Sequence, residues 1–206
     1  MSDPMLLTEH NVHSVPPALR FPIAAASVES IRRYVGTPRP LRTPSDRIFA
    51  VRRTGPPLPL PAALAALPNA ETLAALDQVW VHVDYASYRQ GFEALGGSVG
   101  SLFVDHVFNR KHAREYGYRY VRLVPVSPVV NTSGGRGLET FALATLLGSQ
   151  RSGQTLARFP ESQPIIPRSE VCYAGPFAVC KMLNRVPGNQ DRLPGVQQVY
   201  AAMNLG

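Results

Sequence analysis

The chain has 206 residues, a formal net charge of +7 and a sequence pI of about 9.8. This length gives one sizeable core, or a compact domain with an arm. No stretch approaches the ~18 unbroken apolar residues of a membrane span, and the opening residues MSDPMLLTEH lack the basic start and apolar core of a secretory signal. With two cysteines in total the chain is no disulfide scaffold, so we expect a cytoplasmic protein in a reducing compartment, without a membrane partner.

The basic character comes almost entirely from arginine. Of 21 basic residues, only Lys111 and Lys181 are lysines. Arginine pairs bidentately with phosphate, so a nucleic acid, DNA or RNA, is the expected partner. The codon bias of a GC-rich genome would produce the same excess of arginine, and composition alone does not separate these two explanations.

Proline divides the chain in two. The 20 prolines are about twice the usual share of roughly 5%, and many lie in the first third. We therefore expect residues 1–61 to form a proline- and arginine-rich arm. It would contain one short helix at residues 24–35, with Ser27 as N-cap. Residues 62–206 are expected to form an α+β domain.

The predicted domain contains three strands. Residues 78–85 alternate strictly between apolar and polar positions, which is typical of a half-buried strand. The fold predicted is α+β: a small mixed sheet of strands 79–84, 101–105 and 118–126, packed with helices. The helices expected between the strands also allow a three-layer α/β domain with a parallel sheet. Residues 170–184 predict a helix, kinked or split at Gly175-Pro176, with both cysteines, Cys172 and Cys180, buried on it.

The densest group of chemically useful residues lies between residues 101 and 147. Asp105-His106 ends one predicted strand, Asn131 follows the next strand, and Glu139 opens a helix. Hydrolysis of a phosphodiester requires a base for the attacking water and positive charge for the phosphoryl and leaving oxygens. Histidine suits the base, a carboxylate suits a divalent metal, and an asparagine orients the histidine.

In this order of parts the chain resembles the HNH, or ββα-metal, nuclease family over about residues 104–147. The resemblance implies a metal-dependent nuclease with a ββα-metal centre. Asp105 and Glu139 would bind Mg²⁺ or Mn²⁺, His106 would be the general base and Asn131 would orient it. Arginines near this stretch would hold the substrate phosphate; they are Arg110, Arg122 and Arg136. The chain departs from the family pattern in having Glu139 where His or Asn is usual, a long spacing from His106 to Asn131, and no CxxC pairs.

Two other functions are compatible with the sequence. The first is a noncatalytic nucleic-acid-binding or assembly protein that uses the basic, proline-rich segment before residue 62. The second is a small-molecule enzyme on an α/β sheet, using either His82 with Asp84 or Asp105 with His106. The Asp105-His106 pair is therefore a candidate site in either architecture.

Overall fold

The computed structural model describes residues 17–39, 46–54, 59–67, 69–95, 99–133, 170–184 and 201. In chain order the elements are η1 (Pro17–Leu19), β1 (Pro22–Ala25), α2 (Val28–Tyr34), β2 (Gly36–Arg39), β3 (Ile48–Arg53), α3 (Ala62–Ala65), α4 (Ala70–Ala74), β4 (Asp77–His82), α5 (Tyr88–Ala94), β5 (Phe103–His106), α6 (Arg110–Glu115), β6 (Tyr120–Val126), α7 (Pro128–Ser133), β7 (Val171–Tyr173) and α9 (Pro176–Met182). None of the helices in these ranges is long and apolar enough to cross a bilayer.

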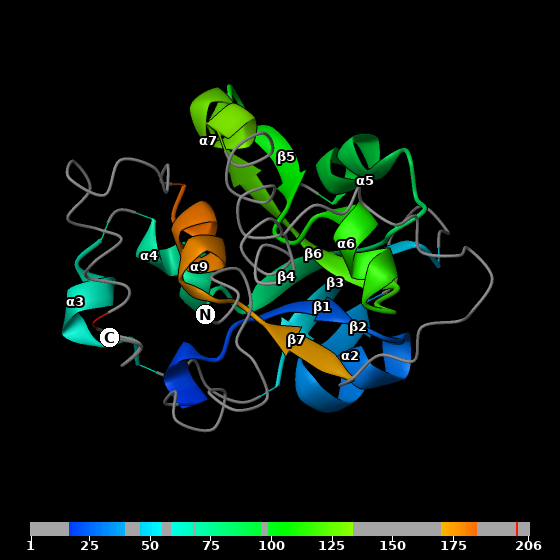
Figure 1. The fold of residues 1–206 in the computed structure, drawn as a ribbon, viewed down its shortest axis with the longest axis horizontal. Helices are drawn as coiled ribbons and strands as arrows, with labels where there is room; N and C mark the ends of the chain where they lie inside the picture. The colour runs from blue at the N-terminus through cyan, green and yellow to red at the C-terminus, as the bar shows by residue number, and fades with distance from the viewer. Residues whose placement is uncertain are drawn as a thin grey trace, which may run out of the picture.

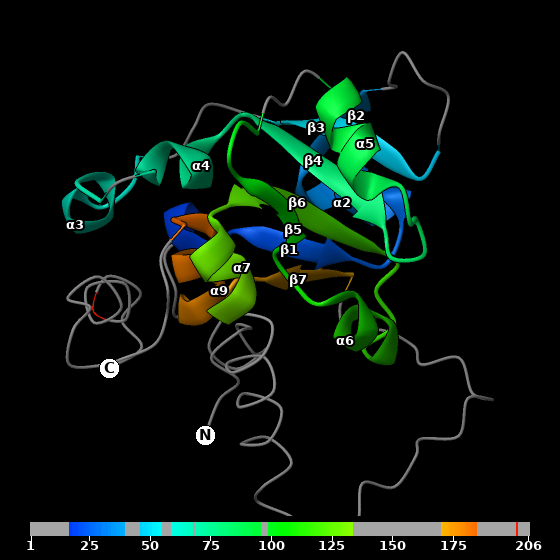
Figure 2. The same ribbon diagram turned by 90° about the horizontal axis from the view of Figure 1, so that it is seen from above.

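The strands form one curled sheet of seven strands in the order β2-β3-β4-β6-β1-β7, with β5 paired to β6 off this path (Figures 1 and 2). β6 is the central strand. It pairs with β4 along one edge, while β1 and then β5 follow each other along the opposite edge. Every pairing in the described sheet is antiparallel. The α+β class is confirmed, whereas the small mixed sheet and the parallel alternative are wrong.

Residues expected to form an arm belong to this sheet. β1, β2 and β3 precede residue 61; β1 pairs with β6 and β7, β2 pairs with β3, and β3 pairs with β4. Strands on both sides of the expected boundary at residue 61 therefore share one sheet. Pro22 opens β1 and Pro38 lies in β2, which among the described strands pairs with β3 alone; in such places the missing N–H breaks no ladder inside the sheet.

The expected helix at residues 24–35 is shorter at its start. Ala24 and Ala25 pair with β6, so α2 begins only at Val28. The Ser27 side chain accepts the backbone N–H of Ser30 at 3.0 Å, which confirms its capping role. Tertiary pairing of two alanines thus outweighs their helix propensity.

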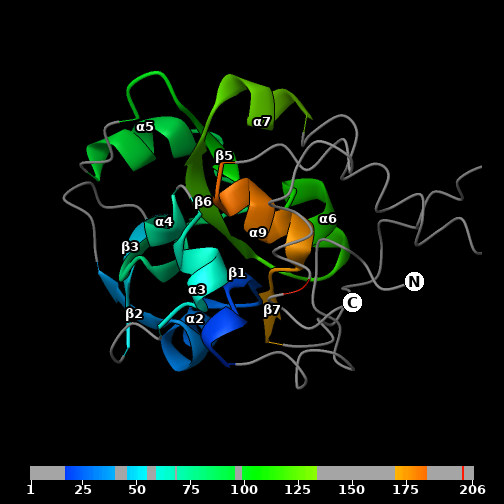
Figure 3. The same cartoon turned by 90° about the vertical axis from the view of Figure 1, so that its left-hand side faces the viewer.

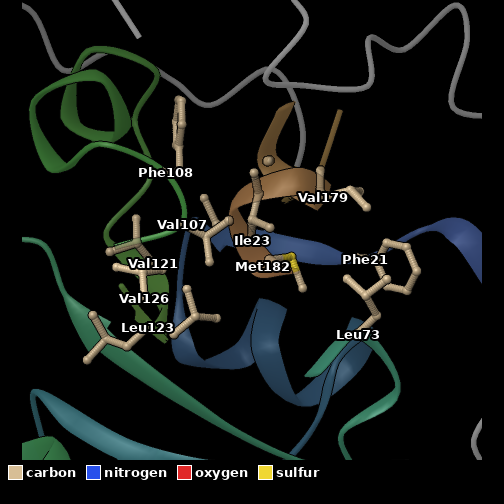
Figure 4. Packing of buried hydrophobic residues seen from close by; sticks show 14 of the residues in the cluster. Phe21, Ile23, Leu73, Val107, Phe108, Val121, Leu123, Val126, Val179 and Met182 are labelled. Carbon is tan, nitrogen blue, oxygen red and sulfur yellow. The ribbon is translucent and has the colours of Figure 1, made fainter. Parts of the chain in front are cut away.

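Each face of the sheet has its own core. The larger cluster includes Val179 and Met182 of α9, Ile23 of β1, and Val121 and Leu123 of β6. Figure 4 shows these side chains gathered where the sheet curls beside α9, and Figure 3 shows α9 in front of β6 and β1. The smaller cluster, on the other face, lies beneath α2 and contains the buried side chains Ala25, Ile31, Val35, Phe49, Val51, Trp80 and Val171.

The segment predicted as a helix at residues 170–184 divides into β7 and α9. Cys172 lies in β7 and Cys180 in α9, so the cysteines are buried as expected but do not share a helix. Pro176 explains the split, because proline is favoured at the first position of a helix but does not allow a helix that begins before it to continue through it.

Candidate functional site

A buried ion pair joins the end of β5 to α9. The Nζ atom of Lys181 lies 2.9 Å from Asp105 Oδ2 and donates a hydrogen bond of 2.6 Å to the backbone oxygen of His106. The other carboxylate oxygen, Oδ1, accepts the backbone N–H of His106 at 2.8 Å. The side chain of Lys181 is only 6% exposed and that of Asp105 20%, so the pair is shielded from solvent. Asp105 is therefore engaged by an ammonium group.

His106 is packed rather than tethered by hydrogen bonds. Its ring lies against Tyr88 of α5, with 4.3 Å between centroids, and its Nε2 atom is buried with no hydrogen-bond partner among the described residues. The Nδ1 atom is 3.9 Å from Asp105 Oδ1, beyond hydrogen-bonding distance. The pKa of His106 is lowered from 6.5 to about 3, chiefly by burial and then by the charges of Arg110, Lys181 and Arg89, while Asp105 opposes them. The imidazole is therefore neutral at physiological pH.

Two arginines lie beside this histidine. The guanidinium carbons of Arg89 and Arg110 are 5.7 and 5.5 Å from the centroid of the Tyr88 ring, and Arg89 is 5.8 Å from that of Phe103. Within the described part of the chain, neither arginine forms an ion pair with a carboxylate. We call Tyr88, Arg89, Phe103, His106 and Arg110 the Tyr88 cluster.

The cluster is assembled from three separate elements. α5 supplies Tyr88 and Arg89, β5 supplies Phe103 and His106, and α6 supplies Arg110. Asn109 starts α6 by accepting the N–H of Lys111 at 2.8 Å. Phe103 is 39% exposed, so an aromatic surface stands beside the cations.

The other residues predicted for the site have different positions. Asn131 lies half-buried in α7, and no hydrogen bond to His106 is found for it within the described structure. Arg122 is in the interior, 2% exposed, and its contact with substrate phosphate stays a prediction. Glu139 and Arg136 lie outside the described residues.

The described residues do not fit the expected divalent metal. A Mg²⁺ or Mn²⁺ ion at Asp105 would stand beside the Lys181 ammonium, which already holds the carboxylate. Among the residues that the structure describes, no three His, Cys, Asp or Glu side chains gather as a metal-binding group. We therefore derive no chemical step from a metal at this position.

The second candidate pair, His82 and Asp84, also has other partners. Arg114 of α6 binds the Asp84 carboxylate, with Nε donating to Oδ1 at 2.8 Å. The backbone N–H of Asp84 donates to His82 Nδ1 at 3.2 Å. These contacts join the end of β4 to α6, so His82 and Asp84 have a structural role in this fold.

Comparison of the chain with protein-family models, with curated proteins and with solved structures found no match.

The sequence prediction missed Tyr88, Arg89, Phe103 and Lys181. An aromatic residue followed by an arginine in the first turn of a helix was a visible signal for the first two. Lys181 is one of only two lysines and lies in the apolar run FAVCKML, which signals a buried cation. Its partner, 76 residues away in sequence, could not be inferred from spacing, because the contact depends on how β5 and α9 meet.

Replacing Asp105 tests the buried ion pair. Asp105→Asn should lower the free energy of unfolding by about 3 kcal/mol, because it removes the carboxylate charge that the buried Lys181 ammonium contacts. Adding Lys181→Met should recover much of this loss. The matched control is Asp84→Asn, which breaks an exposed pair and should cost less than about 1 kcal/mol. Denaturant unfolding measures all four proteins; equal losses for the single and double variants would contradict the pairing.

The pH dependence of stability tests the state of His106. Its folded-state pKa, about 3, lies below the ordinary value of 6.5. As the pH falls, the unfolded chain therefore binds a proton on this histidine before the folded chain does. The contribution of the neutral imidazole to the free energy of unfolding is complete above pH 6.5 and is lost as the pH falls toward 3. The loss reaches at most about 1.4 kcal/mol per pH unit. In denaturant titrations from pH 7 to 4, His106→Phe should have the shallower dependence; identical slopes would disprove the assignment.

Proposed function

We propose that this protein binds nucleic acid through the Tyr88 cluster. The observation that carries the proposal is the placement of Arg89 and Arg110, from two different helices, beside one aromatic ring without a carboxylate partner in the described structure. Guanidinium groups in this state bind phosphate oxygens bidentately. The net charge of +7 attracts a polyanion over a longer range.

The aromatic members favour a strand with accessible bases. Phe103 is partly exposed and lies under Arg89, so a base can stack on the ring while a phosphate meets the guanidinium. Stacking of this kind contributes about 1–3 kcal/mol per base and tolerates any sequence. We therefore propose single-stranded DNA or RNA as the preferred form, bound with little sequence preference.

The salt dependence of binding distinguishes contacts made by the Tyr88 cluster from general attraction by the net positive charge. The double substitution Arg89→Ala/Arg110→Ala should weaken binding of a labelled single-stranded oligonucleotide and lower the slope of log Kd against log salt concentration by about 1.4. Arg32→Ala/Arg33→Ala removes the same charge from α2, where both residues already pair with glutamates. Fluorescence anisotropy from 50 to 300 mM salt measures the slopes. Equal effects of the two doubles would overturn the proposed surface.

A second candidate function is cleavage of the bound strand, and the buried, unpartnered Nε2 of His106 favours it. A bound phosphate would place negative charge beside Arg89 and Arg110, offsetting the cations that lower the pKa of His106. The imidazole then becomes a stronger base toward a water or ribose hydroxyl, and the guanidiniums stabilise the phosphoryl oxygens.

Cleavage is tested on single-stranded RNA, single-stranded DNA and plasmid, each with Mg²⁺, Mn²⁺ or EDTA. His106→Ala should reduce the rate by about 100-fold or more, whereas His112→Ala, a histidine of α6 outside the cluster, should keep it. Activity that survives EDTA excludes a required divalent ion. Gel analysis showing equal rates for wild type and His106→Ala, or none for either, removes this candidate and leaves the binding proposal standing.

A further inference from the structure

A cavity of about 230 Å³ lies on the opposite side of the sheet from α9, near the end of α2. Its walls come from separate parts of the fold and are largely polar or cationic: Arg20, Pro22, Tyr34, Val35, Arg53, Gln78 and Tyr173. Neither the Tyr88 cluster nor the Asp105–Lys181 pair belongs to it. The nucleic-acid proposal therefore leaves this cavity unexplained.

Two guanidiniums and two phenols line the cavity, and none of the described lining residues is a carboxylate. Arg53, at the end of β3, is half-buried and forms no ion pair within the described structure. Burial raises the pKa of Tyr173, whereas the charge of Arg20 opposes this and shows that the two groups lie close together. The phenol remains protonated at neutral pH and can donate a hydrogen bond.

A third guanidinium lies on the same face of the sheet as Gln78, outside the residues that line the cavity. Arg122 of β6 is opposite Trp80 of β4, and thus on the same face as Gln78, two residues earlier in β4. Its Nη2 atom donates to the backbone oxygen of Thr72 at 2.8 Å, but Nε and Nη1 are buried and have no partner among the residues that the structure describes. Burial, together with the charge of Arg53, lowers the pKa of Arg122 to about 9, so it is still a cation at pH 7.

Structural roles alone do not explain this arrangement. A buried cation with two unsatisfied donors is costly, and a second cation beside it increases the cost. An anion in the cavity would offset both, because guanidinium donors and phenol hydroxyls match the oxygens of a tetrahedral oxyanion.

We propose that this cavity binds a small molecule through its phosphate group. Arg53 and Arg20 hold the phosphate oxygens at the wall, Tyr173 donates to them, and Arg122 supplies positive charge from below. The cavity is larger than a phosphate group, so it leaves room for a small organic substituent beside Tyr34. We call this the Arg53 cavity.

Calorimetric titration with inorganic phosphate and with phenyl phosphate tests the proposal. The wild-type protein should bind at least one of them at one site, and Arg53→Gln should weaken binding about tenfold or more, the effect of losing one charged hydrogen-bonding contact. Arg52→Gln is the matched control. It removes the same charge one residue away, from an exposed arginine paired with Asp77, and it should leave the affinity unchanged.

Tryptophan emission locates the bound anion. Trp80 is the only tryptophan of the chain, and its Nε1 donates to Oε1 of Gln78, a cavity residue, at 3.2 Å. Its emission should change with the same affinity as the heat signal. Tighter binding of phenyl phosphate would assign the site to phosphate esters, and equal binding to the free ion. No heat with either probe, or heat that Arg53→Gln leaves unchanged, would overturn the proposal.

Discussion

The ion pair between Lys181 and Asp105 fixes where β5 ends against α9, and the candidate site depends on that position. The same ammonium binds the backbone oxygen of His106, so one cation sets both the carboxylate and the strand end beside the imidazole. A buried pair of this kind contributes little net stability compared with apolar residues of equal size, but it heavily penalises any arrangement that separates its partners. The ion pair therefore fixes the geometry of the site more than it adds to the free energy of unfolding.

Around this fixed point the charges are unbalanced. Arg89 and Arg110 share the Tyr88 ring, and Arg53 and Arg122 lie near each other on the other face of the sheet. Like charges in such proximity raise the energy of the free protein, and an anionic partner lowers it again. Two separate surfaces thus have the same physical signature, one open and aromatic, suited to a polymer, the other hollow, suited to a small anion.

The sequence predicted local features well and long-range ones poorly. The alternation around Trp80 located β4, and Ser27 was identified as a cap, because both signals lie within a few residues. The antiparallel order was not predictable, since β1 and β7 are joined only by pairing between distant parts of the chain. Asp105-His106 was predicted as a site candidate, but its engagement by Lys181 was not foreseeable. The burial of Arg122 was not predicted either, because strand alternation does not tell which face is covered.

The attachment of β5 has a consequence for motion. Among the described strands it is hydrogen-bonded to β6 alone, whereas β1, β3 and β4 each have neighbours on both sides. Detaching β5 breaks one ladder and the Lys181 contact, which costs less free energy than unfolding the entire sheet. The protein can therefore expose the imidazole of His106 in brief partial openings while the remaining strands keep their hydrogen bonds.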